Sequence, residues 1–105
     1  MNKKFIISKN QEILQVIKHG NKKINDYFII YNIESKNNFS RYCISVNKKY
    51  GNAVERNRIK RQIRNILTTN AIKNVYNYVI IIRPGIKGLK YVDIKKYLLE
   101  LIGCE

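Results

Sequence analysis

The chain has 105 residues, of which 45% are hydrophobic, and it carries 21 Lys and Arg against 7 Asp and Glu, a formal net charge of +14. This length allows one small domain with a single core, and the apolar content excludes a disordered basic tail. The charge favours a polyanionic partner, because each phosphate that is neutralised releases condensed counterions. We therefore expect residues 1–105 to form a nucleic-acid-binding domain, with an anionic membrane surface as the weaker alternative.

Several other classes of protein are disfavoured by the sequence. No apolar run approaches the roughly 20 residues that span a bilayer, and the N-terminus lacks a signal-peptide pattern, so we expect a cytoplasmic protein without membrane contact. Cys43 and Cys104 are far apart, and both are expected to be free thiols. His19 is the only histidine, and the seven carboxylates are scattered singly, whereas a metal nuclease gathers several around its ions. We expect no catalytic residue and no metal bound stably by the chain itself.

The first half of the chain predicts one helix and two strands. A helix is expected over residues 8–19, with Ser8 and Gln11 as a capping box and Gly20 as its stop. Strands are expected over residues 27–33 and 41–47, joined by a polar loop and antiparallel to each other. The second of these strands alternates, so that one of its faces is apolar and the other is small and polar enough to be open to solvent.

The second half predicts helix, strand and helix. Asn52 and Glu55 form a second capping box before a helix over residues 53–70, and Gly51 supplies the turn. The apolar run at residues 78–82 predicts a strand that is covered on both faces. An amphipathic helix is expected over residues 91–102. The resulting order is αββαβα, an α+β sandwich of one sheet and three helices.

The helix over residues 53–70 carries the most informative pattern. At about 100° per residue, Ile59, Ile63, Ile66 and Leu67 fall on one face and basic side chains fall on the other. Four of the six arginines lie within nine residues of this helix, and guanidinium groups suit phosphate through bidentate hydrogen bonds. A solvated basic face without a ligand is the alternative interpretation.

The order of residues 48–64 closely resembles the signature of the bacterial ribonuclease P protein component, which is known for its Arg-Asn-Arg motif. Eleven positions match the signature: Lys48, Lys49, Gly51, Ala53, Val54, Arg56, Asn57, Arg58, Lys60, Arg61 and Arg64. The similarity extends to Lys18-His19-Gly20 after the first helix and to Ile81-Ile82-Arg83-Pro84. It therefore covers nearly the whole chain.

The resemblance implies a fold and a function. The fold is αβββαβα, similar to domain 2 of ribosomal protein S5, with a mostly antiparallel sheet, a short additional strand and a left-handed βαβ crossover through the Arg-Asn-Arg helix. The function is that of a non-catalytic protein subunit of ribonuclease P, which removes the 5′ leader of precursor tRNA. The RNA subunit would carry the chemistry with Mg²⁺. The partners would be the RNA subunit and precursor tRNA, and the free protein would be a monomer.

Two RNA-binding surfaces are implied. The first is the basic surface, formed by Lys48, Lys49, Arg56, Asn57, Arg58, Lys60, Arg61 and Arg64. On it we expect Arg58 and Arg61 to meet the RNA subunit, whereas Lys60 and Arg64 lie on the flank nearer the sheet. Arg56 lies near the apolar stripe, so packing or ion pairing is an alternative role for it.

The second surface is a cleft for the single-stranded leader between the first helix and the open sheet face. It would be formed by Ile13, Ile17, Tyr31, Lys60 and Arg64. Relatives often have Phe where this chain has Ile13 and Ile17, so contacts with the leader are expected to be weaker or less selective here. An ordinary core role for the two isoleucines is the alternative.

Three rival classes remain. A ribosomal or other structural RNA-binding protein would share the size and charge but not the Arg-Asn-Arg signature. An autonomous nuclease would need an acidic cluster. A DNA-binding module is disfavoured because the single basic helix has no partner helix of a helix-turn-helix.

Overall fold

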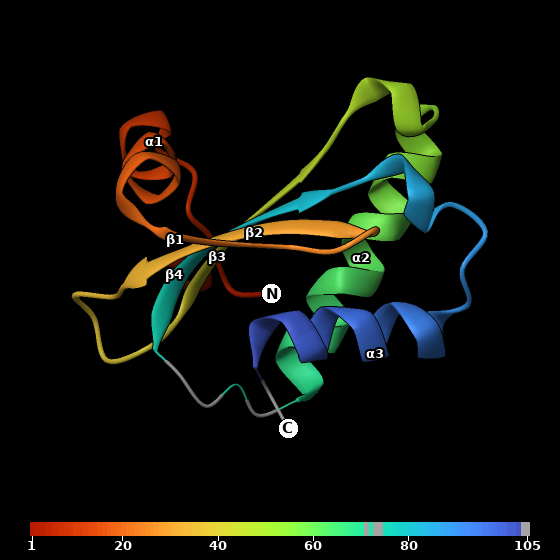
Figure 1. Cartoon of the computed structure of the whole chain (residues 1–105). Helices are drawn as coiled ribbons and strands as arrows, with labels where there is room; N and C mark the ends of the chain where they lie inside the picture. The colour runs from red at the N-terminus through yellow and green to blue at the C-terminus, as the bar shows by residue number, and fades with distance from the viewer. Residues whose placement is uncertain (71, 73–74, 104–105) are drawn as a thin grey trace.

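The computed structural model describes residues 1–70, 72 and 75–103 (Figure 1). Its elements in chain order are the 3₁₀ turn η1 (Lys3–Phe5), α1 (Asn10–His19), β1 (Asn21–Ile24), β2 (Phe28–Glu34), β3 (Arg41–Val46), η2 (Lys48–Tyr50), α2 (Ala53–Thr69), β4 (Tyr76–Ile82), η3 (Pro84–Ile86) and α3 (Tyr91–Ile102). The predicted αβββαβα order and the α+β class are confirmed. Within the described residues, no helix is both long enough and apolar enough to cross a membrane.

The four strands form one mixed sheet in the order β1-β2-β4-β3. The pairs β1–β2 and β2–β4 are antiparallel, and β3–β4 is parallel. Because β3 and β4 are parallel neighbours, the chain crosses from one to the other through α2. This is the predicted βαβ crossover, and its left-handedness stays a prediction.

The strands β2 and β3 run in opposite directions, as predicted, since β2 is antiparallel to β4 and β3 is parallel to it. They are not neighbours in the sheet, however, because β4 is inserted between them. The physical reason lies in β4, whose Tyr78, Val79 and Ile80 are all buried, so that it needs cover on both faces and a central position.

The helices α2 and α3 cover one face of the sheet and form the main core with it (Figure 1). The sheet contributes alternate residues of β2 and β4, such as Phe28, Ile30 and Ile80, which are at most 1% exposed. The apolar face of α2 contributes the four residues predicted for it, Ile59, Ile63, Ile66 and Leu67. These contacts fix which side of α2 faces solvent.

The helix α1 lies alone on the opposite face, with its axis roughly across the strands (Figure 1). Its first half is tied to the start of β3 by an ion pair between Glu12 and Arg41. Its C-terminal end leads directly into β1 through Gly20, where a Cβ atom would lie 2.4 Å from the Val16 carbonyl oxygen and 2.6 Å from that of Asn32. Glycine is needed there because the turn is pressed against β2.

The start of α1 and the additional strand were not predicted correctly from the residues. The expected capping box at Ser8 is absent, because α1 begins at Asn10 after an N-cap Lys9 that makes no side-chain capping hydrogen bond. The preceding segment is extended instead, since the Ile7 N–H donates to the Tyr42 carbonyl. The strand β1 has the polar sequence Asn-Lys-Lys-Ile, in which no alternation marks a strand.

Candidate nucleic-acid interface

The N-terminus of α2 is closed by the predicted capping box. The Asn52 side chain accepts a hydrogen bond from the Glu55 N–H at 2.9 Å, and the Glu55 carboxylate accepts one from the Asn52 N–H at 3.2 Å. This backbone hydrogen bond, together with the Lys87 ammonium at 3.4 Å, holds the pKa of Glu55 below its ordinary value. Glu55 is therefore an ionised structural group of the helix cap.

Gly51 precedes this cap for a steric reason. Its φ of 165° is extended backbone that any residue can adopt. A Cβ atom on Gly51 would instead lie 2.6 Å from the Glu55 carboxylate. The glycine thus leaves room for the capping side chain, which refines the turn-forming role expected of it.

The solvent face of α2 carries a row of basic side chains without acidic partners. The exposed residues are Asn57, Arg58, Arg61 and Arg64, and the half-buried ones are Arg56 and Lys60. Lys48 and Lys49 are exposed in η2, directly before the helix. In the part of the chain that the structure describes, the two ion pairs are Arg41–Glu12 and Lys87–Glu55. None of the basic side chains of η2 and α2 therefore takes part in an ion pair there. Their positive charge is therefore directed to solvent.

The basic residues of α2 divide into two flanks. Arg58 lies on the flank next to η3, where it lines a shallow hollow with Glu55 and Lys87. Lys60 lies on the opposite flank, close enough to Cys43 of β3 to affect its ionisation. Burial raises the pKa of the Cys43 thiol, and the Lys60 ammonium partly offsets that effect. Lys60 thus lies on the flank of α2 that is next to β3.

The sheet face on which α1 lies is built from rows of directly opposed residues. One row runs Lys22–Tyr31–Val79–Cys43 across β1, β2, β4 and β3. The next row runs Ile24–Ile29–Ile81–Ser45. We call these two rows together the open strip. Val79 is buried, but the Tyr31 ring and the Cys43 thiol are only half-buried, and Ser45 and Ile24 are exposed.

The helix α1 forms a wall beside the open strip. Val16 is 2% exposed and directed at the sheet. At 100° per residue, Ile13 and Ile17 then lie on one flank of α1, and Glu12 and Gln15 lie on the other. Glu12 and Gln15 line a hollow of about 320 Å³ with the loop between β2 and β3, so Ile13 and Ile17 face the open strip. Ile13 is half-buried and Ile17 is 36% exposed, which is consistent with a wall rather than a closed core.

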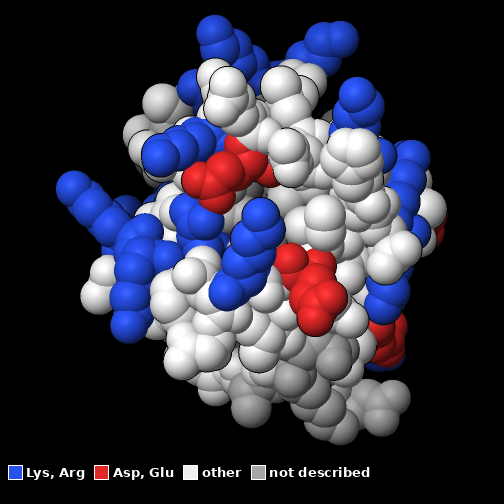
Figure 2. All heavy atoms as spheres, turned by 90° about the vertical axis from the view of Figure 1, so that its left-hand side faces the viewer, with Lys and Arg blue, Asp and Glu red and all other residues white. Residues whose placement is uncertain are grey.

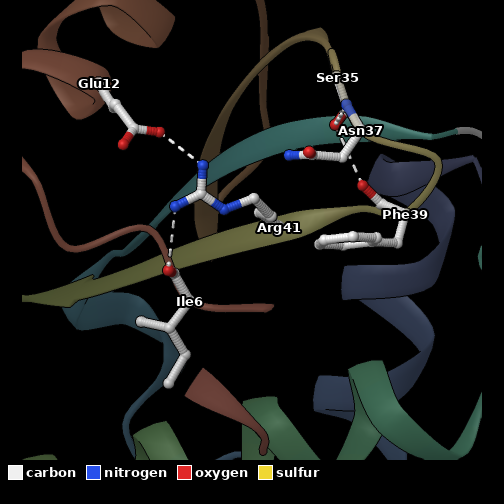
Figure 3. Close-up of polar contacts among 6 residues, drawn as sticks. All are labelled: Ile6, Glu12, Ser35, Asn37, Phe39 and Arg41. Carbon is white, nitrogen blue, oxygen red and sulfur yellow. Dashed lines mark hydrogen bonds and ion pairs between the residues drawn. The ribbon is translucent and has the colours of Figure 1, made fainter. Parts of the chain in front are cut away.

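Arg41 fixes the position of this wall (Figure 3). Its guanidinium donates to the Glu12 carboxylate of α1 and, at 3.4 Å, to the Ile6 carbonyl. The Arg41 and Glu12 side chains are only 19% and 34% exposed. One side chain therefore joins the N-terminal segment, α1 and β3.

The predicted site residues are thus brought together in two adjoining places. The residues of the basic surface lie on η2 and on the solvent face of α2, whereas Ile13, Ile17 and Tyr31 lie at the open strip, with Lys60 between the two places. Figure 2 views the molecule from the side on which α1 lies, where Lys and Arg side chains lie around the margins and also near the middle of the face, and acidic side chains occupy a few spots. The RNA-binding role of each residue stays a prediction.

Two features of this region were missed from the sequence. The first is Lys22, whose ammonium lies 5.8 Å from the centre of the Tyr31 ring. The second is the Arg41–Glu12 ion pair. Both depend on pairings between distant segments, so no local pattern marked them. Tyr50, at the end of η2, packs against the core and accepts a hydrogen bond from Lys87 at its carbonyl.

Acidic and thiol side chains are not gathered into a metal site in the described residues. No group of three or more His, Cys, Asp or Glu side chains that could hold an ion occurs in residues 1–70, 72 and 75–103. Cys43 is a free thiol, and the expectation for Cys104 lies outside the described residues.

Comparisons with known proteins agree with the arrangement of these elements. The chain is 35% identical over 104 residues to the ribonuclease P protein component of Streptococcus pneumoniae, covering 97% of this chain and 85% of that protein. A solved structure of the Staphylococcus aureus ribonuclease P protein superposes with a TM-score of 0.87 at 31% identity, covering 94% and 93% of the two chains. The ribonuclease P protein of Thermotoga maritima superposes with a TM-score of 0.85 at 26% identity, covering 94% and 96%.

The family model for ribonuclease P matches residues 1–104. With the Arg-Asn-Arg helix in place on α2 and relatives above 30% identity over nearly the full chain, the chain belongs to the ribonuclease P protein component family and has a role in ribonuclease P.

Proposed function

We propose that this chain is the RNA-binding subunit that assists the RNA of ribonuclease P in removing the 5′ leader of precursor tRNA. The basic surface on η2 and α2 would bind the RNA subunit. The open strip beside α1 would bind the single-stranded leader. The free protein would be a cytoplasmic monomer.

The observation that carries this proposal is the composition of α2. Its buried face packs four aliphatic residues into the core, while its opposite face presents basic side chains that no ion pair in the described residues neutralises. Guanidinium groups held on a rigid helix can donate paired hydrogen bonds to the oxygens of a phosphate. The same helix also carries residues that match the family signature, and this match supports the RNA of ribonuclease P as the partner.

The open strip supports the second half of the proposal. A single strand of RNA is held by positive charge along its backbone and by ring surfaces on which bases stack. Tyr31 supplies such a ring, and Lys60 supplies a cation on the neighbouring flank of α2. Ile13 and Ile17 supply apolar contact without a ring, so Tyr31 would carry most of the stacking.

In this proposal the protein positions RNA and the RNA subunit carries out cleavage. Magnesium ions held mainly by that RNA would activate the attacking water and stabilise the leaving oxygen. The carboxylates of Glu12 and Glu55 already have structural partners, in Arg41 and in the capping box. These two carboxylates would therefore serve the fold and not the cleavage step.

The test is cleavage of a 5′-extended precursor tRNA at low Mg²⁺ concentration. Three samples are compared: the protein alone, a bacterial ribonuclease P RNA alone, and the two together. The proposal predicts cleavage that appears or rises strongly only in the mixture. Cleavage by the protein alone would show an autonomous nuclease, and no stimulation in any mixture would favour a ribosomal type of RNA-binding protein.

A further inference from the structure

The strand β1 places two consecutive lysines on opposite faces of the sheet. Lys22 is paired with Tyr31, and Lys23 is paired with Ile30. Because side chains on a strand alternate, Lys22 lies on the open face with Tyr31, and Lys23 lies on the face that carries the buried Ile30. The two residues carry the same charge, lie on the same strand and are both exposed, but their surroundings differ.

The row that contains Lys22 has a cation at each end. Its ammonium lies 5.8 Å from the Tyr31 ring centre. The other end of the row is Cys43 of β3, and α2, the helix that carries Lys60, contacts that strand. Neighbouring strands are about 4.8 Å apart, so the row is about 14 Å wide from β1 to β3. Between the two lysines lie the aromatic ring of Tyr31, the buried Val79 and the small Cys43.

We infer that Lys22 is a second phosphate-binding residue for the leader, and that the RNA crosses the open strip along this row, parallel to α1 and across the strands. This inference rests on the proposed function. A base stacked on Tyr31 would leave its flanking phosphates directed toward the two lysines. The α1 wall, tied down near β3 by Arg41 and joined to β1 at Gly20, runs in the same direction as the row.

The direction of the RNA follows from the position of α2. The basic surface of α2 would hold the RNA subunit, where the scissile bond is located, and Lys60 belongs to that helix. The leader would therefore enter the strip beside Lys60 and leave it over β1. Lys22 would meet nucleotides farther from the cleavage site than those that meet Lys60.

The experiment uses the reconstituted holoenzyme with the Lys22→Ala variant and the matched control Lys23→Ala. Binding is measured for precursor tRNAs whose leaders are shortened one nucleotide at a time and for leaderless tRNA, at several salt concentrations. We expect Lys22→Ala to weaken binding of long-leader precursors roughly three- to tenfold and to lower the salt slope by about 0.7. Lys23→Ala should bind like the original protein, and the effect of Lys22→Ala should vanish once the leader is too short to reach β1.

The Lys60→Ala and Tyr31→Ala variants separate failure of the inference from failure of the proposed function. If they weaken leader-dependent binding while Lys22→Ala does not, or if the two β1 variants weaken it equally, the inference about Lys22 is overturned and the proposed function stands. If neither Lys60→Ala nor Tyr31→Ala affects leader-dependent binding, the proposed leader site itself is wrong, and the inference falls with it.

Discussion

The two sides of the sheet are held together in different ways. On the α2–α3 side, residues such as Ile63, Ile80 and Leu98 are fully buried in one continuous apolar core. On the α1 side, Val16 and Val79 are buried, but the neighbouring residues are half-open and an ion pair helps to hold the helix. Because apolar burial is the main source of stability, the first side should carry the stability of the fold. The second side is then free to present a surface for binding.

The largest expected effect tests whether the α2–α3 side of the sheet carries more of the stability than the α1 side. Replacing the fully buried Ile63 by Ala should lower the free energy of unfolding by about 2–5 kcal/mol, through lost burial and the cavity left behind. The same replacement at Ile17, which is 36% exposed, should cost less than about 1 kcal/mol. Urea unfolding of both variants measures the difference. Equal losses would mean that α1 belongs to the same core.

The next effect concerns the two flanks of α2. Replacing Arg58 and Arg61 together by Ala should weaken assembly with the RNA subunit roughly tenfold or more, because charge-assisted hydrogen bonds to phosphate are lost. Discrimination between precursor and leaderless tRNA should change much less. Filter binding at several salt concentrations gives the assembly affinity. The control is the double replacement of Lys95 and Lys96 on α3, which removes the same charge; an equal effect in that control would show that only net charge matters.

A smaller effect is expected at the link between α1 and β3. Glu12→Gln should lower stability by about 1 kcal/mol, since the ion pair with Arg41 is only partly buried. Because the pair positions the wall of the open strip, the variant should also lose part of its preference for precursor over leaderless tRNA. Urea unfolding and competition binding measure the two effects. A stability loss with full leader preference would show that the pair does not position the strip.

The smallest effect concerns Glu55 and its dependence on pH. The pKa of Glu55 is lowered in the folded chain, so its contribution to stability is fully present above the ordinary carboxyl pKa and is lost as the pH falls through the lowered value. Glu55→Gln should therefore be less stable than the original protein at neutral pH, and the gap should close on acidification. Urea unfolding at a series of pH values measures this gap. A gap that is independent of pH would mean that the charge of Glu55 is not what stabilises the cap.

The sequence predicted the α2 region well because its determinants are local. The capping box at Asn52, the spacing of Ile59 and Ile63 and the grouping of the arginines all lie within a few turns of one helix. The division of basic residues into two flanks also follows from helical geometry alone. The expected partner, the RNA of ribonuclease P, came instead from the resemblance of this segment to a known family.

Features that depend on distant pairings could not be predicted in this way. The insertion of β4 between β2 and β3 depends on which strands pair with its two edges, and no residue of the loop between β2 and β3 marks that choice. The strand β1 is held by its pairing with β2, so its own polar residues gave no strand pattern. Likewise, Ser8 has a capping sequence, but the segment before it is held in extended form by Tyr42.

The central claim, that the open strip holds the leader, is tested most directly at Cys43, which lies in the strip beside Lys60. In a Cys104→Ser background it is the only thiol of the chain, and its rate of alkylation can be followed in the holoenzyme. We predict that precursor tRNA with a leader slows alkylation strongly, whereas leaderless tRNA leaves the rate close to that of the holoenzyme alone. Equal rates with both RNAs would contradict the claim and place the leader elsewhere on the protein.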